Sequence, residues 1–246
     1  MRFLKVFSLI IFPILLLLSN PIFAQTDPGV PDTVKFGEWK ACVPCPPCSG
    51  RAIVPVEFFN DEDVIGFILL LKESQILDID TLLFAEEYSE IISLWGLGIG
   101  DSSGNEDMSN SFSVGAVSFN DSIPPIFESK TILHLYFAVI DTGIASLDSL
   151  RLKLPPGDVF TKFTLPSADE FVPQFLKTEY HITPTPQGDA NLDGEVNLGD
   201  VIYLARYIFG KEPIIFDKCT PCEDINGDGN LDLSDVIELA HYILGH

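Results

Sequence analysis

The feature that most constrains the fold is a tandem repeat near the C-terminus. Residues 189–210 read DANLDGEVNLGDVIYLARYIFG, and residues 224–245 read DINGDGNLDLSDVIELAHYILG. The offset is 35 residues, and 13 of the 22 aligned positions are identical. Self-similarity at a fixed period indicates that one structural unit occurs twice. The C-terminal part is therefore expected to fold as two matching units that pack together.

Each copy begins with acidic and amide residues at the spacing of a twelve-residue calcium loop. Such a loop supplies oxygen ligands from positions 1, 3, 5, 7, 9 and 12, with position 7 using its backbone carbonyl. Position 6 turns sharply and needs glycine, here Gly194 and Gly229. The pattern predicts two calcium ions. The predicted ligands are Asp189, Asn191, Asp193, Glu195, Asn197 and Asp200 in the first loop, and Asp224, Asn226, Asp228, Asn230, Asp232 and Asp235 in the second.

Position 12 departs from the ordinary calcium loop, because it holds Asp200 or Asp235 instead of glutamate. The shorter side chain reaches less far, so bidentate binding requires the loop backbone to come closer to the ion. This predicts weaker calcium binding, or competition from magnesium.

An amphipathic run follows each loop. Its apolar residues recur at i, i+3, i+4 and i+7, which predicts one helix per unit, with Gly210 and Gly245 as C-terminal caps. The segments before the loops, 183–188 and 219–223, contain proline and do not favour an entering helix. Each unit is therefore a loop followed by one exiting helix, and the two helices are expected to pack face to face.

This combination resembles a type I dockerin over residues 188–246. Dockerins are small secreted modules that fold on binding two calcium ions and dock onto cohesin domains of a scaffold. The resemblance implies a cohesin-type partner, contacted by loop positions 10 and 11 and by the exiting helices, in two alternative orientations. The implied contact residues are Leu198, Gly199, Leu204, Ala205 and Arg206 in the first unit, and Leu233, Ser234, Leu239, Ala240 and His241 in the second.

Residues 25–181 show a different pattern, with short apolar runs separated by turn signals. Phe, Val and Ile dominate these runs, which favours half-buried strands. Asp78–Tyr88 is left open as a helical turn or a loop. Many short strands at this spacing predict an all-β antiparallel sandwich. The expected strands are Thr33–Trp39, Ala52–Phe59, Val64–Leu71, Ile91–Ile99, Ser111–Phe119, Thr131–Ile140, Leu147–Leu154 and Phe171–His181.

The sandwich has a resemblance of its own. Ile53–Phe59, Val64–Leu71 and Thr131–Ile140 look like strands of a cohesin or of a related carbohydrate-binding jelly roll. This implies a second binding module, joined to the dockerin-like part by a proline-rich linker at residues 182–187. A chain with both modules could link to copies of itself.

The aromatic residues of the sandwich allow two interpretations. Trp39, Trp95 and Tyr136 could form an exposed platform for sugars, but core packing is the favoured interpretation, because large aromatic side chains are usually buried. His134 is expected on the outer face of a strand.

The cysteines leave two chemistries open. Cys42, Cys45 and Cys48 form one group, and Cys219 and Cys222 form another. Two C-x-x-C units could hold a structural zinc ion, whereas disulfides are the usual outcome outside the cytoplasm, and these are favoured. Five is an odd number, so one thiol is left over in any pairing within the chain.

The N-terminus predicts secretion. Arg2 and Lys5 precede an apolar run, and Ile22–Ala24 ends with a small residue, as in a signal peptide spanning residues 1–24. An uncleaved anchor is the alternative, although the run is short for a membrane span. The mature protein is expected to be extracellular or at the cell surface.

Charge and motifs narrow the function further. The formal net charge of −22 argues against nucleic acid and anionic lipid as partners. The chain has no G-x-S-x-G or H-E-x-x-H motif, so we expect no catalytic activity. The favoured function is a secreted, non-catalytic assembly protein. The alternatives are a carbohydrate-binding component of a polysaccharide-degrading system and a calcium-stabilised structural tail without a partner.

Overall fold

The computed structural model describes residues 27, 29–43, 50–92, 94–99, 110–119, 121–154, 157–210 and 223–245. The predicted signal peptide lies outside these residues, as do Cys45, Cys48, Cys219 and Cys222. Within the described part of the chain, no helix is both long enough and apolar enough to cross a membrane.

The first of two large sheets is built around the long strand β3. Among the described strands this sheet has six members, in the order β14-β1-β3-β8-β5, with β2 also paired to β3. Every second residue of β3 is buried, as expected for a strand with one face on a core. The bounds are β1 Thr33–Phe36, β2 Lys40–Cys42, β3 Gly50–Asn60, β5 Leu77–Phe84, β8 Ile126–Val139 and β14 Gln174–Phe175.

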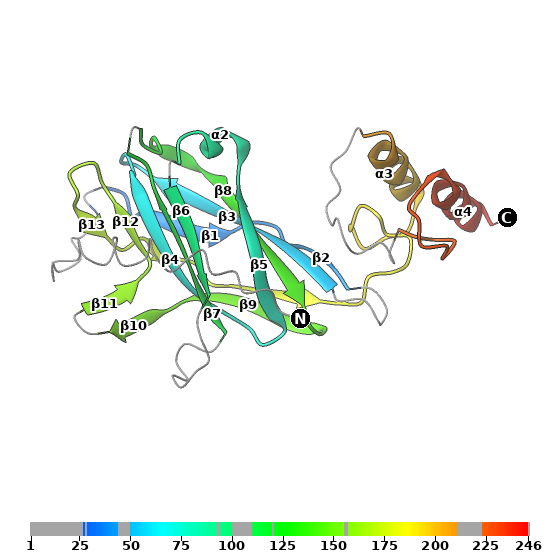
Figure 1. Cartoon of the computed structure of the whole chain (residues 1–246), viewed down its shortest axis with the longest axis horizontal. Helices are drawn as coiled ribbons and strands as arrows, with labels where there is room; N and C mark the ends of the chain where they lie inside the picture. The colour runs from blue at the N-terminus through cyan, green and yellow to red at the C-terminus, as the bar shows by residue number, and fades with distance from the viewer. Residues whose placement is uncertain are drawn as a thin grey trace.

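The second large sheet has seven described strands, with β4 at its centre. The path runs β13-β12-β4-β7-β6, while β9 joins β4 to β15. A separate two-stranded ribbon, β10-β11, extends from this part (Figure 1). The bounds are β4 Gly66–Glu73, β6 Leu94–Ile99, β7 Ser111–Val117, β9 Gly143–Ser149, β10 Arg151–Leu154, β11 Gly157–Phe160, β12 Lys162–Thr164, β13 Glu170–Phe171 and β15 Thr178–Ile182.

A phenylalanine-rich core joins the two sheets. Phe58 of β3 lies 5.0 Å, between ring centroids, from Phe67 of β4 and 4.7 Å from Phe163 of β12. Phe112 of β7 and Phe137 of β8 make a further contact across the layers at 5.8 Å. Two of these contacts are edge-on and the contact of Phe58 with Phe163 is tilted, and centroid distances of this size are typical of buried aromatic pairs. The predicted β-sandwich is therefore confirmed, with antiparallel pairing throughout the described strands except for the parallel pair β1 and β14.

The stretch whose secondary structure the sequence left open consists mostly of a strand. Residues 78–88 were expected to form a helical turn or a loop, but Leu77–Phe84 form β5, followed by the short helix α2 at Glu86–Ser89. A register shift between Ile79 and Thr81 interrupts the pairing of β5 with β8. Such a bulge breaks the two-residue alternation that identifies a strand in a sequence.

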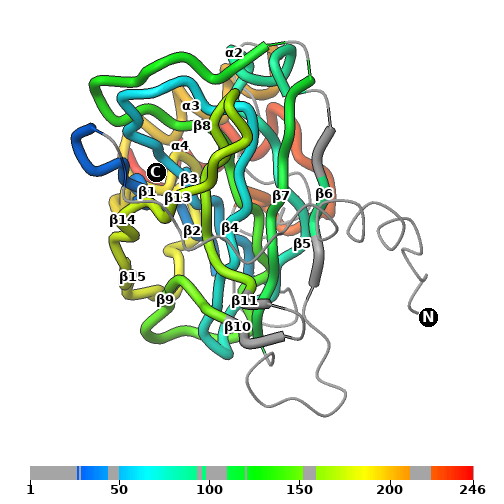
Figure 2. The backbone as a smooth tube through the Cα atoms, turned by 90° about the vertical axis from the view of Figure 1, so that its left-hand side faces the viewer, coloured from blue at the N-terminus to red at the C-terminus, as the bar shows by residue number. Residues whose placement is uncertain are grey.

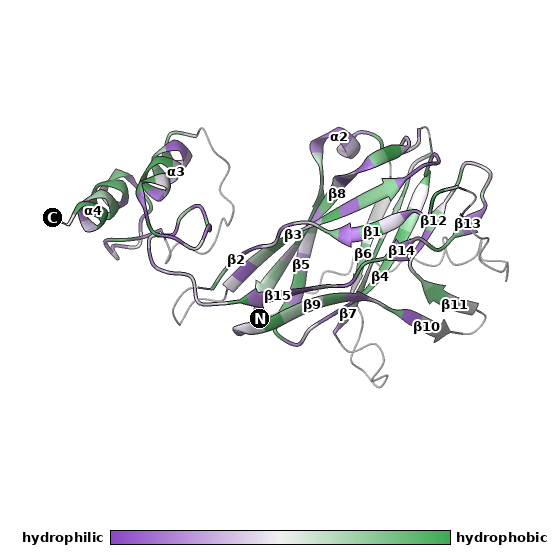
Figure 3. Cartoon of the chain, turned by 180° about the vertical axis from the view of Figure 1, so that it is seen from behind, coloured by the Kyte–Doolittle hydropathy of each residue, from purple (hydrophilic) through white to green (hydrophobic). Residues whose placement is uncertain are grey.

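The C-terminal part contains the two predicted helices, α3 at Leu198–Ile208 and α4 at Leu233–Leu244. They stand beside each other at one end of the molecule, apart from the two sheets (Figure 1), and lie behind the sandwich in the end-on view (Figure 2). Hydrophobic and hydrophilic residues alternate along both helices (Figure 3). Ala190, Leu204 and Leu239 form the buried centre of this part.

The connection between the two parts is fixed at one point. The backbone N–H of Val43 donates to Thr185 Oγ1 at 3.0 Å, and the N–H of Thr185 donates to the Val43 carbonyl at 3.2 Å. The segment after β15 therefore continues along the end of β2 before it turns into the first loop.

Candidate calcium loops and docking face

The aspartate at position 12 closes each loop. In the first copy, Asp200 Oδ1 accepts from the N–H of Asn191 at 3.1 Å and Oδ2 accepts from the N–H of Asn197 at 2.8 Å. In the second copy, Asp235 Oδ1 accepts from the N–H of Asn226 at 3.3 Å and Oδ2 accepts from the N–H of Asp232 at 2.9 Å. The same carboxylate therefore ties positions 3 and 9 together in both copies.

Position 1 organises the turn at the middle of the loop. Asp189 Oδ2 accepts from the N–H of Gly194 at 3.0 Å, and Asp224 Oδ2 accepts from the N–H of Gly229 at 2.9 Å. These glycines have φ of +88° and +84°, a left-handed conformation that costs most other residues free energy. The sharp turn predicted at position 6 is thus present in both loops.

Each loop also begins its helix. Asn197 and Asp232 are the N-cap residues of α3 and α4, and the position-12 aspartate completes a reciprocal capping box in both. Asp232 Oδ1 accepts from both the N–H and the hydroxyl of Ser234 at 2.7 Å, and these bonds lower the pKa of Asp232.

The donor set fits a hard cation. The predicted side chains of both loops offer carboxylate and amide oxygens, and each position-12 aspartate is fully buried. Burial, together with the charges of Asp200 and Asp193, raises the pKa of Asp189, so negative charge converges at the first loop. The loop backbone lies close to the short aspartate at position 12, because at least two of its N–H groups donate to that carboxylate in each copy.

The comparison with protein families identifies this part of the chain. Residues 187–244 match the model of the dockerin type I domain. The matched residues, called here the dockerin segment, contain both loops and both helices, and the sandwich lies outside them. No curated protein matches the chain.

Several solved structures resemble the chain at low identity. A non-cellulosomal cohesin from the archaeon Archaeoglobus fulgidus is 13% identical with a TM-score of 0.43, and covers 63% of this chain and 92% of that chain. A chain of the Coh-OlpA-Doc918 complex from Clostridium thermocellum is 12% identical with a TM-score of 0.44, covering 62% and 99%. The seventh ScaB type I cohesin from Pseudobacteroides cellulosolvens is 15% identical with a TM-score of 0.42, covering 63% and 93%. At these scores the two-sheet architecture is established by the strand pairing and not by the likeness.

Two of the expected docking residues are buried. Leu204 and Leu239 are each only 1% exposed, because they pack against each other's helix in the centre of the dockerin segment. Arg206 and His241 are exposed, and Ala205 and Ala240 are half-buried.

Four exposed apolar residues of the dockerin segment occupy equivalent positions on the two helices, as two pairs. Leu198 and Leu233, which open the two helices, are 53% and 46% exposed, and Ile202 and Ile237 are 60% and 56% exposed. The members of each pair are 35 residues apart, the offset of the sequence repeat. On each helix these residues are spaced i, i+4 and so share one face. We call these four residues the docking face.

The aromatic, histidine and cysteine side chains of the sandwich that were considered above, where the structure describes them, are buried or half-buried. Trp39 is 4% exposed and stacks on Tyr180 with ring centroids 5.6 Å apart, so it belongs to the core, whereas the side chain of Trp95 lies outside the described ones. Tyr136 and His134 are half-buried, and burial lowers the pKa of His134. Cys42 is buried at the end of β2.

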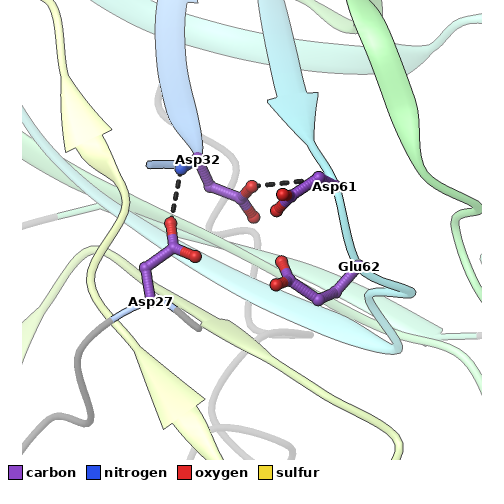
Figure 4. A group of neighbouring side chains, drawn as sticks. All are labelled: Asp27, Asp32, Asp61 and Glu62. Atoms are coloured by element: carbon purple, nitrogen blue, oxygen red, sulfur yellow. Dashed lines mark hydrogen bonds between the residues drawn. The ribbon is translucent and has the colours of Figure 1, made fainter. Parts of the chain in front are cut away.

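The sequence missed one group of acidic residues in the sandwich. Asp27, Asp32, Asp61 and Glu62 each place a carboxylate oxygen within 4.8 Å of the others (Figure 4). Burial is the main cause that raises the pKa of Asp32 and of Glu62 to about 7 each, and the neighbouring carboxylates add to it. None of the four belongs to a motif. The sequence pattern placed Asp32 just before one expected strand and Asp61 and Glu62 just after another, but it did not indicate that these strands pair.

Proposed function

We propose that this chain is a secreted, non-catalytic assembly protein. Its dockerin segment binds two calcium ions and docks onto a cohesin-type partner, either on a scaffold or on a second copy of this chain. The sandwich serves as a second binding module. The match of residues 187–244 to the dockerin type I model supports the class of partner.

The observation that carries the proposal is the paired docking face. Exposed apolar side chains are costly in water unless a partner covers them, and grouped ones mark interaction sites. Here the two groups, Leu198 with Ile202 and Leu233 with Ile237, repeat each other beside two loops with the same hydrogen bonds. Such a surface offers a partner two equivalent ways to bind, related by the internal repeat.

Calcium acts on this face through the loops. The capping boxes show that the loop residues and the starts of α3 and α4 are one structural unit. Metal binding to the folded loops stabilises them by mass action, so removing calcium is expected to disorder the docking face. Calcium dependence by itself does not distinguish docking from a structural tail, because both need the loops.

The experiment is a capture assay with the full chain. The immobilised protein is exposed with calcium to the secreted and surface proteins of its source organism and then eluted with EDTA. Mass spectrometry of the eluate is expected to identify a protein with a cohesin domain. A chain that is folded with calcium but captures nothing would contradict the docking function, and elution of a polysaccharide-bound protein without a cohesin would favour the carbohydrate alternative.

Two substitutions separate docking from folding. Ile202→Ser and Ile237→Ser change exposed positions, so each variant is expected to stay folded. Because the two helices present equivalent residues of the docking face, each single variant is expected to keep most of its affinity for the partner. The variant with both substitutions is expected to lose at least about tenfold in affinity. Leu83→Ser, at a 56% exposed position of β5, is the matched control and should bind as the wild type does. Equal binding by the double variant would place the contact elsewhere.

A further inference from the structure

We propose that the sandwich has a calcium site of its own, formed by Asp27, Asp32, Asp61 and Glu62. This inference is independent of the proposed docking function. The four residues come from two places in the chain that strand pairing brings together. Asp32 precedes β1, Asp61 and Glu62 follow β3, and the antiparallel pairing sets Thr33 opposite Phe59.

Three carboxylate oxygens in this group have no hydrogen-bond donor. Asp32 Oδ2, Asp61 Oδ1 and Glu62 Oε2 are all buried and unpartnered, and the whole side chain of Asp32 is inaccessible to solvent. Figure 4 shows the carboxylates of Asp32, Asp61 and Glu62 pointing toward one another. An unpartnered buried carboxylate oxygen is costly, and a cation is the partner that three of them can share.

The remaining oxygens are held by backbone donors. Asp32 Oδ1 accepts from the N–H of Asp61 at 3.1 Å, and Asp61 Oδ2 accepts from the N–H of Val30 at 2.8 Å. The two oxygens of Asp27 accept from the N–H groups of Gly29 and Asp32. Each of the three aspartates thus accepts at least one hydrogen bond from a backbone N–H group, in the way that outer hydrogen bonds orient metal ligands.

The chain is shaped to allow this approach. The backbone at Gly29 lies close to Asp61, and a side chain at this position would displace the carboxylate of Asp61. On the other side, Asn60 is buried and its amide donates to the carbonyl of Glu62 at 2.7 Å, which holds the turn after β3.

The chemistry of the donors selects the ion. All four ligands are carboxylates, which suit calcium, magnesium and manganese better than softer metals. Calcium binds oxygen at about 2.3–2.6 Å, so oxygens on opposite sides of the ion lie about 5 Å apart, whereas those around magnesium lie about 4.2 Å apart. Oxygens that all lie within 4.8 Å of one another are close enough to share one calcium ion. No ion pair in the described part of the chain brings a lysine or arginine to this cluster.

The test uses the full chain and counts calcium by equilibrium dialysis. The wild type is expected to bind three ions, two in the dockerin segment and one in the sandwich. Asp32→Asn with Asp61→Asn is expected to bind two, and Glu62→Gln is a second variant with at least about tenfold weaker binding of the third ion. Asp63→Asn is the neighbouring control, because Asp63 contacts Ser122 and lies outside the cluster.

A spectroscopic measurement assigns the third ion to the sandwich. Both tryptophans of the chain, Trp39 and Trp95, belong to the sandwich, so the thermal transition of tryptophan fluorescence reports on it alone. Calcium is expected to raise the midpoint for the wild type and for Asp63→Asn but not for the double variant. In EDTA the double variant is expected to melt at or above the wild type, because it has less charge repulsion.

The outcomes separate the two proposals. If calcium leaves the tryptophan transition of the wild type unchanged, or if the double variant binds as many ions as the wild type, the sandwich site is refuted. If the loops fail to bind and the sandwich site holds, the count is one ion and the tryptophan transition still responds to calcium. In either case, the variant with Asp32→Asn and Asp61→Asn is expected to capture the docking partner as the wild type does.

Discussion

At the scale of single residues, the aspartates at position 12 have two tasks. Asp200 and Asp235 close their loops through backbone N–H groups, and they are also the third residues of α3 and α4 that complete the capping boxes. Capping contributes about 1 kcal/mol to helix stability. The loop and the start of the helix are thus coupled through one carboxylate, and a change there is expected to affect both.

A second buried carboxylate belongs to the sandwich and predicts a pH effect. Glu73, at the end of β4, is 6% exposed and its Oε2 has no hydrogen-bond partner. Burial, with the charge of Asp78 adding to it, raises the pKa of Glu73 from 4.5 to about 8. The folded state therefore keeps this proton after the unfolded state has lost it, and Glu73 lowers the free energy of unfolding as the pH rises from about 4.5 to about 8.

Replacing Glu73 by glutamine is expected to remove this pH dependence. At pH 9, Glu73→Gln should be more stable than the wild type by about 2 kcal/mol or more, and the difference should shrink toward pH 4.5. Urea unfolding followed by tryptophan fluorescence across this pH range, with calcium constant, measures it. Glu128→Gln, at an exposed position of β8, is the control and should change little. A difference that stays constant with pH would contradict the assignment.

At the scale of elements, the two C-terminal helices depend on a small shared core. Among its described apolar side chains only those of Ala190, Leu204 and Leu239 are buried, with half-buried neighbours around them. The two exposed isoleucines, Ile202 and Ile237, lie two positions before these leucines on other faces of the same helices. Neighbouring apolar positions on one helix therefore have different surroundings, one in the buried core and the other on the exposed surface that we propose for docking.

Truncation of the shared core is expected to unfold the dockerin segment. Leu204→Ala or Leu239→Ala should each cost about 2–4 kcal/mol, a large loss for a unit with so few buried residues. The helical circular dichroism signal at saturating calcium measures it. Ile202→Ala and Ile237→Ala are the matched controls and should retain the helices. If the leucine variants were as stable as these controls, the assigned packing would be incorrect.

At the scale of the whole molecule, the described residues form two separate hydrophobic cores. The large cluster between the sheets contains residues from Val34 to Ile182, and the small cluster of the dockerin segment shares none of them. The hydrogen bonds between Val43 and Thr185 anchor the start of the linker to the sandwich. Two parts with separate cores are expected to unfold separately.

Deletion of residues 187–246 tests this organisation. The deletion keeps Thr185, so the sandwich should melt within about 2 °C of its midpoint in the full chain at the same calcium concentration. Tryptophan fluorescence follows this transition. A large drop in the midpoint would favour the alternative of a structural tail that stabilises its own sandwich, since it would require contacts across the two parts.

The sequence alone determined the features that depend on local spacing. The two loops, the helices that follow them and the glycines at position 6 were readable because every participating residue lies within one short repeat. Most strands were readable as apolar runs, but β5 was not, because its bulge breaks the alternation of buried residues. The periodicity of α3 and α4 showed that they are amphipathic, but it did not show which apolar residues face the partner helix.

Tertiary structure decided the features that depend on distant residues. Leu204 and Leu239 became core residues because α3 packs on α4, which left Ile202 and Ile237 on the surface. The carboxylates of the proposed sandwich site meet because β1 pairs with β3, although Val30 and Asp61, which are joined by a hydrogen bond, are 31 residues apart in sequence. Spacing within a segment constrains the local backbone, whereas the pairing of strands and the packing of helices choose among many arrangements that the same local pattern permits.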